Sequence, residues 1–175
     1  MRIGIDIDCV CNNLVDNWIA YLNNKYDLTV KYNDITDYNI KLFYPMLTKD
    51  EIFEPLKDDN FWLELIPKSD SIIYLKKLID DGHEIKLITA TDVKSMPIKS
   101  KWVINHYPFL NKRDIYMVFD KSWINTDILL DDCIDNLKSD TYTGVCYSQP
   151  WNSKYDGLRV NNWIEFYNLI NIIKR

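Results

Sequence analysis

The sequence predicts an α/β fold built on a parallel sheet. In the second half of the chain, short apolar runs alternate with stretches of helical periodicity. This alternation is typical of parallel strands joined by right-handed helical crossovers. Residues 14–60, by contrast, lack strand signals and separate the first apolar run from the others. At 175 residues, with 47% hydrophobic residues, the chain suits one domain that carries a small inserted subdomain.

The first third of the chain is predicted to hold one strand and at least two helices. Residues 1–5 form an apolar run typical of a buried strand, and apolar spacing predicts a helix over residues 13–25. Residues 32–45 are rich in Asn, Asp and aromatic residues, which predicts a loop. Thr48 and Glu51 form a capping-box signature, so a helix is expected to begin there.

The rest of the chain alternates between the two kinds of periodicity. Ser69 is expected to cap a helix that Gly82 ends. The elements expected after it are strands at 83–89, 114–118, 127–131 and 142–147, and helices at 98–106 and 163–173. The predicted sheet therefore has five strands.

Pairs of acidic residues follow two of the apolar runs. Asp6 and Asp8 come directly after the first strand with one residue between them, and Asp131 and Asp132 end a later strand. Two carboxylates this close oppose joint ionisation unless a cation or a proton is shared between them. The Asp6–Asp8 pair therefore suggests a divalent metal, an acid/base pair, or both. Read alone, it also suits a solvated junction between strand and loop.

Hydroxyl and lysine side chains complete a chemically recognisable set. Thr89 ends an apolar run that lies between the two acidic pairs, and Lys99 follows in a helical stretch. The C-terminal ends of parallel strands converge on one crevice, so these polar residues are expected to meet there. Carboxylates that hold magnesium and attack phosphorus, with Thr and Lys on the phosphate oxygens, are suited to phosphoryl transfer.

The set resembles the four motifs of the haloacid dehalogenase-like (HAD) phosphatases. Within that superfamily the chain is similar to the 5'(3')-deoxyribonucleotidase family, through residues 61–67, 99–103 and 129–135. The resemblance spans nearly the whole chain. It implies a Rossmann-like three-layer core over residues 1–13 and 66–175, with a small helical cap over residues 14–65. The chain departs from the family where Thr89-Ala90-Thr91 replaces the frequent Thr-Ser-Pro, which bears on substrate preference.

The resulting hypothesis is a Mg²⁺-dependent phosphatase acting on (deoxy)ribonucleoside monophosphates. Asp6 is predicted to be the nucleophile, and Asp8 the acid that protonates the leaving group and then the base for water. Magnesium is expected to bind Asp6, Asp131 and the backbone carbonyl of Asp8. Asp132 is expected to orient Lys99 or a metal-bound water from outside the ligand set.

Five residues are predicted to bind substrate. Thr89 and the amide of Ala90 are assigned to the phosphate oxygens, and Lys99 is expected to neutralise charge on the phosphate and the nucleophile together. The resemblance points to Phe61 and Trp62 as aromatic residues that stack on the base.

Composition limits the partners. A net charge of −5 argues against an extended nucleic-acid backbone as the main partner, whereas a small nucleotide remains compatible. No stretch approaches membrane-spanning length, and the chain enters its first strand without a signal peptide, so we expect a cytoplasmic protein. The sequence leaves open whether the chain forms a homodimer.

Other chemistries are less well supported. Cys9, Cys11 and Cys133 suggest a zinc site only weakly, because no His or fourth Cys lies at ligand spacing. His83 and His106 fit structural roles. Two rival functions remain: a phosphatase of the same mechanism on a sugar phosphate or a nucleic-acid 3'-phosphate, and a non-catalytic nucleotide- or metal-binding module. The presence of Asp8 argues against the second, since binding alone would not need it.

Overall fold

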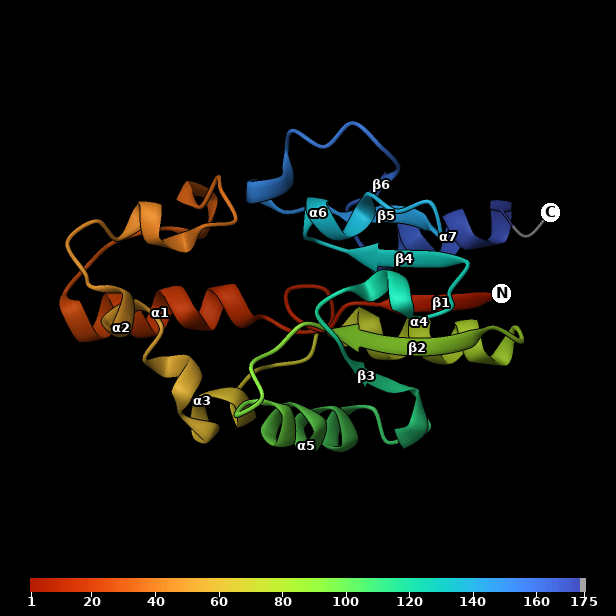
Figure 1. The fold of residues 1–175 in the computed structure, drawn as a ribbon, viewed down its shortest axis with the longest axis horizontal. Coiled ribbons are helices and arrows are strands. Elements are labelled where there is room, and N and C mark those ends of the chain that lie inside the picture. Colours follow the sequence, from red (N-terminus) through yellow and green to blue (C-terminus); the bar gives the residue numbers. More distant parts are fainter. Residues whose placement is uncertain (174–175) are drawn as a thin grey trace.

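A computed structural model describes residues 1–173, so the last two residues of the expected core, 174–175, lie outside it. Within the described residues, six parallel strands form one sheet in the order β3-β2-β1-β4-β5-β6 (Figure 1). The strands are β1 (Arg2–Ile5), β2 (Glu84–Thr89), β3 (Ile115–Met117), β4 (Ile128–Asp131), β5 (Thr143–Tyr147) and β6 (Arg159–Val160). The expected parallel α/β fold is confirmed, with one strand more than the sequence predicts.

The central position of β1 explains why its residues from Ile3 to Ile5 are all apolar. β1 pairs with β2 on one side and β4 on the other, and both Ile3 and Ile5 are fully buried. A strand covered on both faces has no solvent side, so polar residues do not alternate with apolar ones. The neighbours are close: a Cβ at Gly4 would lie 2.9 Å from Ile88 Cδ1.

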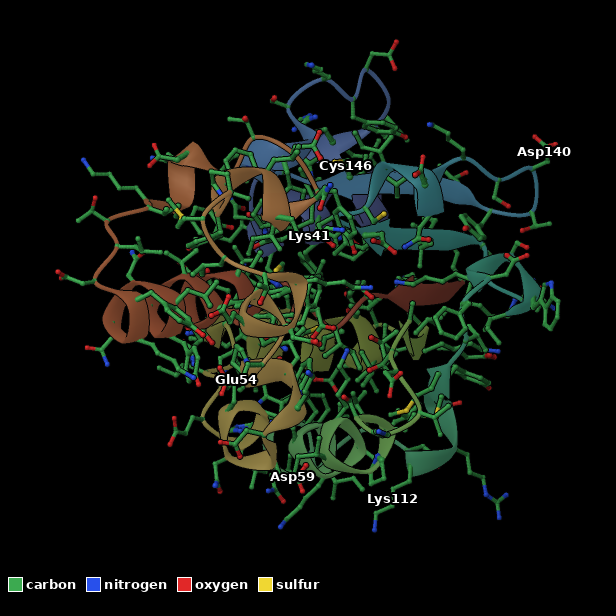
Figure 2. The ribbon with its side chains drawn as sticks, turned by 60° about the vertical axis from the view of Figure 1, so that its left-hand side comes forward. Lys41, Glu54, Asp59, Lys112, Asp140 and Cys146 are labelled. Atoms are coloured by element: carbon green, nitrogen blue, oxygen red, sulfur yellow. The ribbon has the colours of Figure 1, made fainter. Side chains whose placement is uncertain are left out.

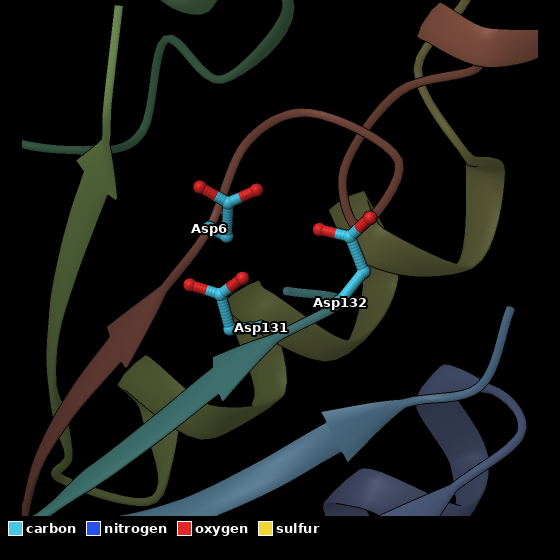
Figure 3. Close-up of side chains that lie close together, drawn as sticks. All are labelled: Asp6, Asp131 and Asp132. Carbon is cyan, nitrogen blue, oxygen red and sulfur yellow. The ribbon is translucent and has the colours of Figure 1, made fainter. Parts of the chain in front are cut away.

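Helices cover the sheet and the C-terminal ends of its strands. The helices are α1 (Leu14–Tyr26), α2 (Lys49–Ile52), α3 (Asp59–Leu63), α4 (Ser69–Asp80), α5 (Met96–His106), α6 (Ile134–Leu137) and α7 (Trp163–Ile173). α4 and α7 lie on the same face of the sheet (Figures 1 and 3), where the rings of Tyr74 and Tyr167 are 5.5 Å apart. Lys68, rather than Ser69, is the N-cap residue of α4, and Gly82 follows that helix with φ +84°.

Residues 14–65, here called the inserted segment, contain helices and no strand. The strands of the sheet point towards this segment (Figure 1). In the turned view of Figure 2 its residues Lys41, Glu54 and Asp59 lie far from Asp140, which precedes β5. The predicted capping box is present, but α2 ends at Ile52 and a separate 3₁₀ helix follows at Pro55–Lys57. The inserted segment therefore stands over the C-terminal ends of the strands.

The two chain crossings that connect this segment to the core are tied to each other. Asn12 and Pro67 form an isolated antiparallel bridge, and the Lys68 amide donates to the Cys11 carbonyl at 2.8 Å. Trp102 of α5 donates from Nε1 to the Leu65 carbonyl at 2.8 Å. These bonds fix where the inserted segment leaves and rejoins the core. Among residues 1–173, no helix is both long and apolar enough to cross a membrane.

Candidate active site

Three buried carboxylates meet where β1 and β4 end (Figure 3). The Asp6 amide donates to the Leu130 carbonyl at 2.9 Å, so the pairing of β1 with β4 continues to the first acidic residue and places it beside the second acidic pair. Each of Asp6, Asp131 and Asp132 offers a carboxylate oxygen within 4.8 Å of the others. All three residues are at most 5% exposed.

Neighbouring donors hold this acidic cluster in place. Asp131 accepts hydrogen bonds from the Cys133 amide at 2.8 Å and from Asn136 Nδ2 at 3.0 Å. Asp132 accepts from Trp151 Nε1 at 2.9 Å. Asp132 thus lies in the acidic cluster; the prediction that it orients Lys99 or a metal-bound water from outside the ligand set stays a prediction.

Lys121 is a candidate site residue that the sequence analysis missed. It follows β3 in a short 3₁₀ helix at Lys121–Trp123 and is 3% exposed. Its Nζ donates to Asp6 Oδ1 and, at 2.6 Å, to Asp131 Oδ2. Burial lowers the pKa of the Lys121 ammonium, but the two carboxylates outweigh it and raise that pKa above its ordinary value. The Lys121 ammonium therefore lies beside Asp6, while the sequence predicts that Lys99 neutralises charge on the phosphate and the nucleophile together.

The acidic cluster has the composition of a divalent-cation site. Burial raises the pKa of Asp6 to about 7, Lys121 opposes the rise, and Asp131 adds to it. Burial and the other two carboxylates likewise raise the pKa of Asp132 well above its ordinary value. One ammonium does not balance three carboxylates, so a further cation would lower their mutual repulsion. Hard carboxylate oxygens fit Mg²⁺.

Asp8 faces a different lysine. The chain leaves β1 at Ile5 and turns at Cys9, whose φ is +61°, so strand alternation no longer sets the direction of Asp8. Its carboxylate accepts from Lys99 Nζ and, at 3.2 Å, from Asn12 Nδ2. Lys99 Nζ also lies 3.4 Å from Thr89 Oγ1. The structure thus groups Asp8, Lys99 and Thr89 beside the acidic cluster.

A cavity of about 1120 Å³ opens over both groups. Core residues that line it include Asp6, Asp8, Ala90, Lys99 and Lys121, and the inserted segment contributes an apolar wall that includes Trp18, Phe53 and Trp62. A site between two parts of the chain, apolar with a few polar groups, is typical of small-molecule binding.

The two aromatic residues predicted to stack on a base differ in position. Trp62 lines the cavity, and Lys99 Nζ lies 4.7 Å from its ring centroid. Phe61 is not among the lining residues; its ring packs edge-on against Tyr21 and Trp62 at 6.3 and 6.1 Å. Adjacent residues of one helical turn point in different directions, so Trp62 faces the cavity here while Phe61 packs behind it.

The cysteines are poorly placed to form a metal site. Cys9, Cys11 and Cys133 are free, and burial raises the pKa of each thiol above its ordinary value. Metal ligation needs the thiolate, and the metal-sized cluster found among the described residues contains only aspartates. His83 is buried just before β2, at the opposite end of that strand from Thr89.

Comparison with known proteins identifies the family. The family model described as 5' nucleotidase, deoxy (pyrimidine), cytosolic type C protein matches residues 1–175. The chain belongs to this family. It is 30% identical to a 5'(3')-deoxyribonucleotidase of Bacillus subtilis over 166 residues, covering 93% of this chain and 94% of that protein. It is 25% identical to a protein of the same name from Clostridium acetobutylicum, with 93% and 91% covered.

Solved structures confirm the fold of this nucleotidase-family chain. A HAD family hydrolase from Deinococcus radiodurans matches with a TM-score of 0.68 and 11% identity, over 99% of this chain and 96% of that one. A HAD hydrolase from Entamoeba histolytica matches with a TM-score of 0.62 and 10% identity, over 99% of both. The chain is therefore a HAD-like phosphatase, a hydrolase of phosphoric monoesters.

Proposed function

We propose that this chain hydrolyses (deoxy)ribonucleoside monophosphates by a magnesium-dependent route through an aspartyl-phosphate at Asp6. The observation that carries the proposal is the pairing of two carboxylates with two lysines at one cavity: Asp6 with Lys121, and Asp8 with Lys99. Two carboxylates in different settings are suited to different roles. The names of the relatives supply the nucleotide as substrate.

In the first step, an Asp6 carboxylate oxygen forms a bond to phosphorus while the bond from phosphorus to the ester oxygen breaks. Asp8 gives its proton to the departing alkoxide. In the second step Asp8 takes a proton from water, whose oxygen attacks the same phosphorus and releases phosphate and free Asp6. Lys121 offsets the charge of Asp6 and Asp131 throughout.

The phosphate is proposed to lie between the strand ends. The Thr89 hydroxyl, the Ala90 amide and Lys99 are proposed to bind its oxygens. In support, Thr89 ends β2 beside Lys99, and Ala90 lines the cavity. Asp6, Asp131 and the Asp8 carbonyl would hold magnesium, with Asp132 beside them. When bound, the ion supplies charge that reduces the repulsion between carboxylate and phosphate.

Metal removal tests the cofactor. Chelation with excess EDTA should lower phosphatase activity by more than about a hundredfold, since charge stabilisation by a metal contributes several kcal/mol. Activity should return when magnesium exceeds the chelator. The rate is measured on a deoxyribonucleoside monophosphate and on p-nitrophenyl phosphate. Unchanged rates on both esters in EDTA would contradict the magnesium assignment.

The contribution of the apolar wall to nucleotide binding can be tested by comparing substrates with and without a base. A stacked base contributes roughly 1–3 kcal/mol, so deoxyribonucleoside monophosphates should exceed p-nitrophenyl phosphate and ribose phosphate in kcat/KM by about tenfold to a hundredfold. Trp62→Leu should remove most of this advantage, because Trp62 lines the cavity. Phe61→Leu is the matched control: it alters the packing behind Trp62 without removing a lining residue. Equal kcat/KM values for nucleotides and simple esters in the wild type would favour a phosphatase of broader specificity.

A further inference from the structure

One buried loop of the core contacts the inserted segment, the Asp8 turn and the acidic cluster at the same time. The loop, residues 149–152, follows β5 and includes a 3₁₀ helix at Pro150–Asn152. Gln149, Trp151 and Asn152 are all at most 8% exposed. None of these three residues belongs to the predicted motifs, so the proposed chemistry leaves their burial unexplained.

The Gln149 side chain joins the inserted segment to the Asp8 turn. Its Nε2 donates to the Cys9 carbonyl at 2.8 Å, and its Oε1 accepts from the Tyr32 hydroxyl. A carbonyl oxygen can only accept, so the amide must present its nitrogen to Cys9 and its oxygen to Tyr32. Both ends of this buried amide are thereby used, one on each part of the chain.

A hydrogen bond to the Cys9 carbonyl restrains the turn that carries Asp8. Cys9 directly follows Asp8 and adopts φ +61°, a left-handed conformation that costs free energy for a residue with a side chain. Its amide donates to Asn12 Oδ1 at 3.0 Å, and Asn12 also donates to the Asp8 carboxylate. The turn that carries Asp8 is thus held at the amide by Asn12 and at the carbonyl by Gln149.

The remainder of the loop is anchored to the acidic cluster. Trp151 Nε1 donates to Asp132 Oδ2, and Asn152 Nδ2 donates to the Asp132 carbonyl, both at 2.9 Å. Asn152 Oδ1 in turn accepts from the backbone N–H of Gln149 at 3.0 Å. Tyr32 also packs its ring edge-on against Trp151, with centroids 5.6 Å apart. Gln149 is therefore held by Asn152, which is itself hydrogen-bonded to Asp132 of the acidic cluster.

We propose that Gln149 is a positioning residue for Asp8, and that Tyr32 of the inserted segment holds the Gln149 amide in its working orientation. This inference rests on the proposed function, because it takes Asp8 as the proton donor to the leaving group. Through this connection the Asp8 turn is in position only while the part of the inserted segment that carries Tyr32 lies against the core.

The substrate pair separates positioning of Asp8 from loss of folded protein. A nucleoside alkoxide needs a proton to leave, whereas p-nitrophenolate leaves well without one. The kcat/KM for each ester reports the steps up to departure of its leaving group. Gln149→Met removes both hydrogen bonds at similar length. It should lower kcat/KM on a deoxyribonucleoside monophosphate by about tenfold, and on p-nitrophenyl phosphate by less than about threefold.

A double-mutant cycle tests the connection to Tyr32. Tyr32→Phe keeps the ring against Trp151 but removes the hydroxyl, and should lower the nucleotide kcat/KM in the same direction by about threefold. In the Gln149→Met background it should have no further effect, because the shared bond is already lost. Tyr167→Phe is the matched control. The Tyr167 hydroxyl donates to Asp81 Oδ2 at 2.7 Å, and neither residue lines the cavity. This variant should keep the wild-type kcat/KM on both substrates.

The outcomes separate this inference from the proposed function. Wild-type protein that fails to hydrolyse either ester with magnesium would overturn the proposed function itself. An active wild type whose Gln149→Met variant loses the same factor on both substrates would overturn the positioning role alone. Fully additive effects of Tyr32→Phe and Gln149→Met would overturn the connection to the inserted segment.

Discussion

Replacing Asp6 with asparagine should abolish turnover, with a loss in kcat of about ten-thousandfold or more. The carboxylate is the proposed nucleophile, and an amide oxygen is far less nucleophilic. Among the groups around Asp6, the Lys121 ammonium favours the anionic carboxylate, whereas burial and the neighbouring Asp131 raise the pKa of Asp6. The measurement is steady-state hydrolysis together with acid quenching, which traps phosphoenzyme formed from labelled substrate. Neither product nor phosphoenzyme is expected.

The control keeps the chemical change and moves it to the surface. Asp135 follows the acidic cluster by three positions, and its exposed carboxylate pairs with Lys138 at 3.1 Å. Asp135→Asn should retain wild-type kcat and the same thermal unfolding curve. Near wild-type turnover or a trapped phosphoenzyme in Asp6→Asn would show that a different group attacks phosphorus.

Most of the fold could be predicted from the sequence because the central strands β1 and β4 are largely buried and helices α1, α4 and α7 are amphipathic. Their apolar patterns are long enough to read, as in α1 and α7. β6 was missed because Arg159–Val160 is only two residues long, and its pairing with Cys146 and Tyr147 is a tertiary contact. Such a strand exists only because β5 offers a free edge.

The candidate site was predictable where motif residues end strands, as at Asp6, Thr89 and Asp131. Lys121 was missed because it lies between Phe119 and Trp123, which are 77% and 81% exposed. Buried lysine between exposed aromatic residues reverses the usual hydropathy pattern. Its position in the sequence could have indicated it, because Lys121 follows β3 and so lies at the same C-terminal ends of the strands as the acidic pairs.

Lys99 shows the limit of motif spacing in a different way. The sequence correctly placed a lysine in a helix after β2, and Lys99 is 4% exposed within α5. Spacing along the chain did not show which carboxylate it would face. The turn at Cys9 directs Asp8, rather than Asp6, towards Lys99, and a positive φ at a residue other than glycine has no reliable sequence signature.

The two buried lysines can be distinguished by experiment. Lys121→Met should lower kcat by about a thousandfold on nucleotides and p-nitrophenyl phosphate alike, because the lost ammonium offsets charge on Asp6 during attack on any ester. Lys99→Met should cost about a hundredfold or less and should raise KM, since Lys99 contacts Asp8 and Thr89. The matched control is Lys112→Met, because Lys112 is exposed on the surface of the α/β domain (Figure 2).

Magnesium should distinguish loss of catalysis by Lys121→Met from loss of folding. Removing one partner of a buried ion pair costs about 3–5 kcal/mol, so the variant should unfold at a lower temperature than wild type in EDTA. The Lys121 ammonium contacts the same carboxylates that the ion is proposed to bind. Magnesium should therefore stabilise Lys121→Met more than it stabilises wild type, while kcat stays low. If Lys99→Met instead blocked phosphoenzyme formation and Lys121→Met left it intact, Lys99 would be the lysine that supports the nucleophile, as the sequence first indicated.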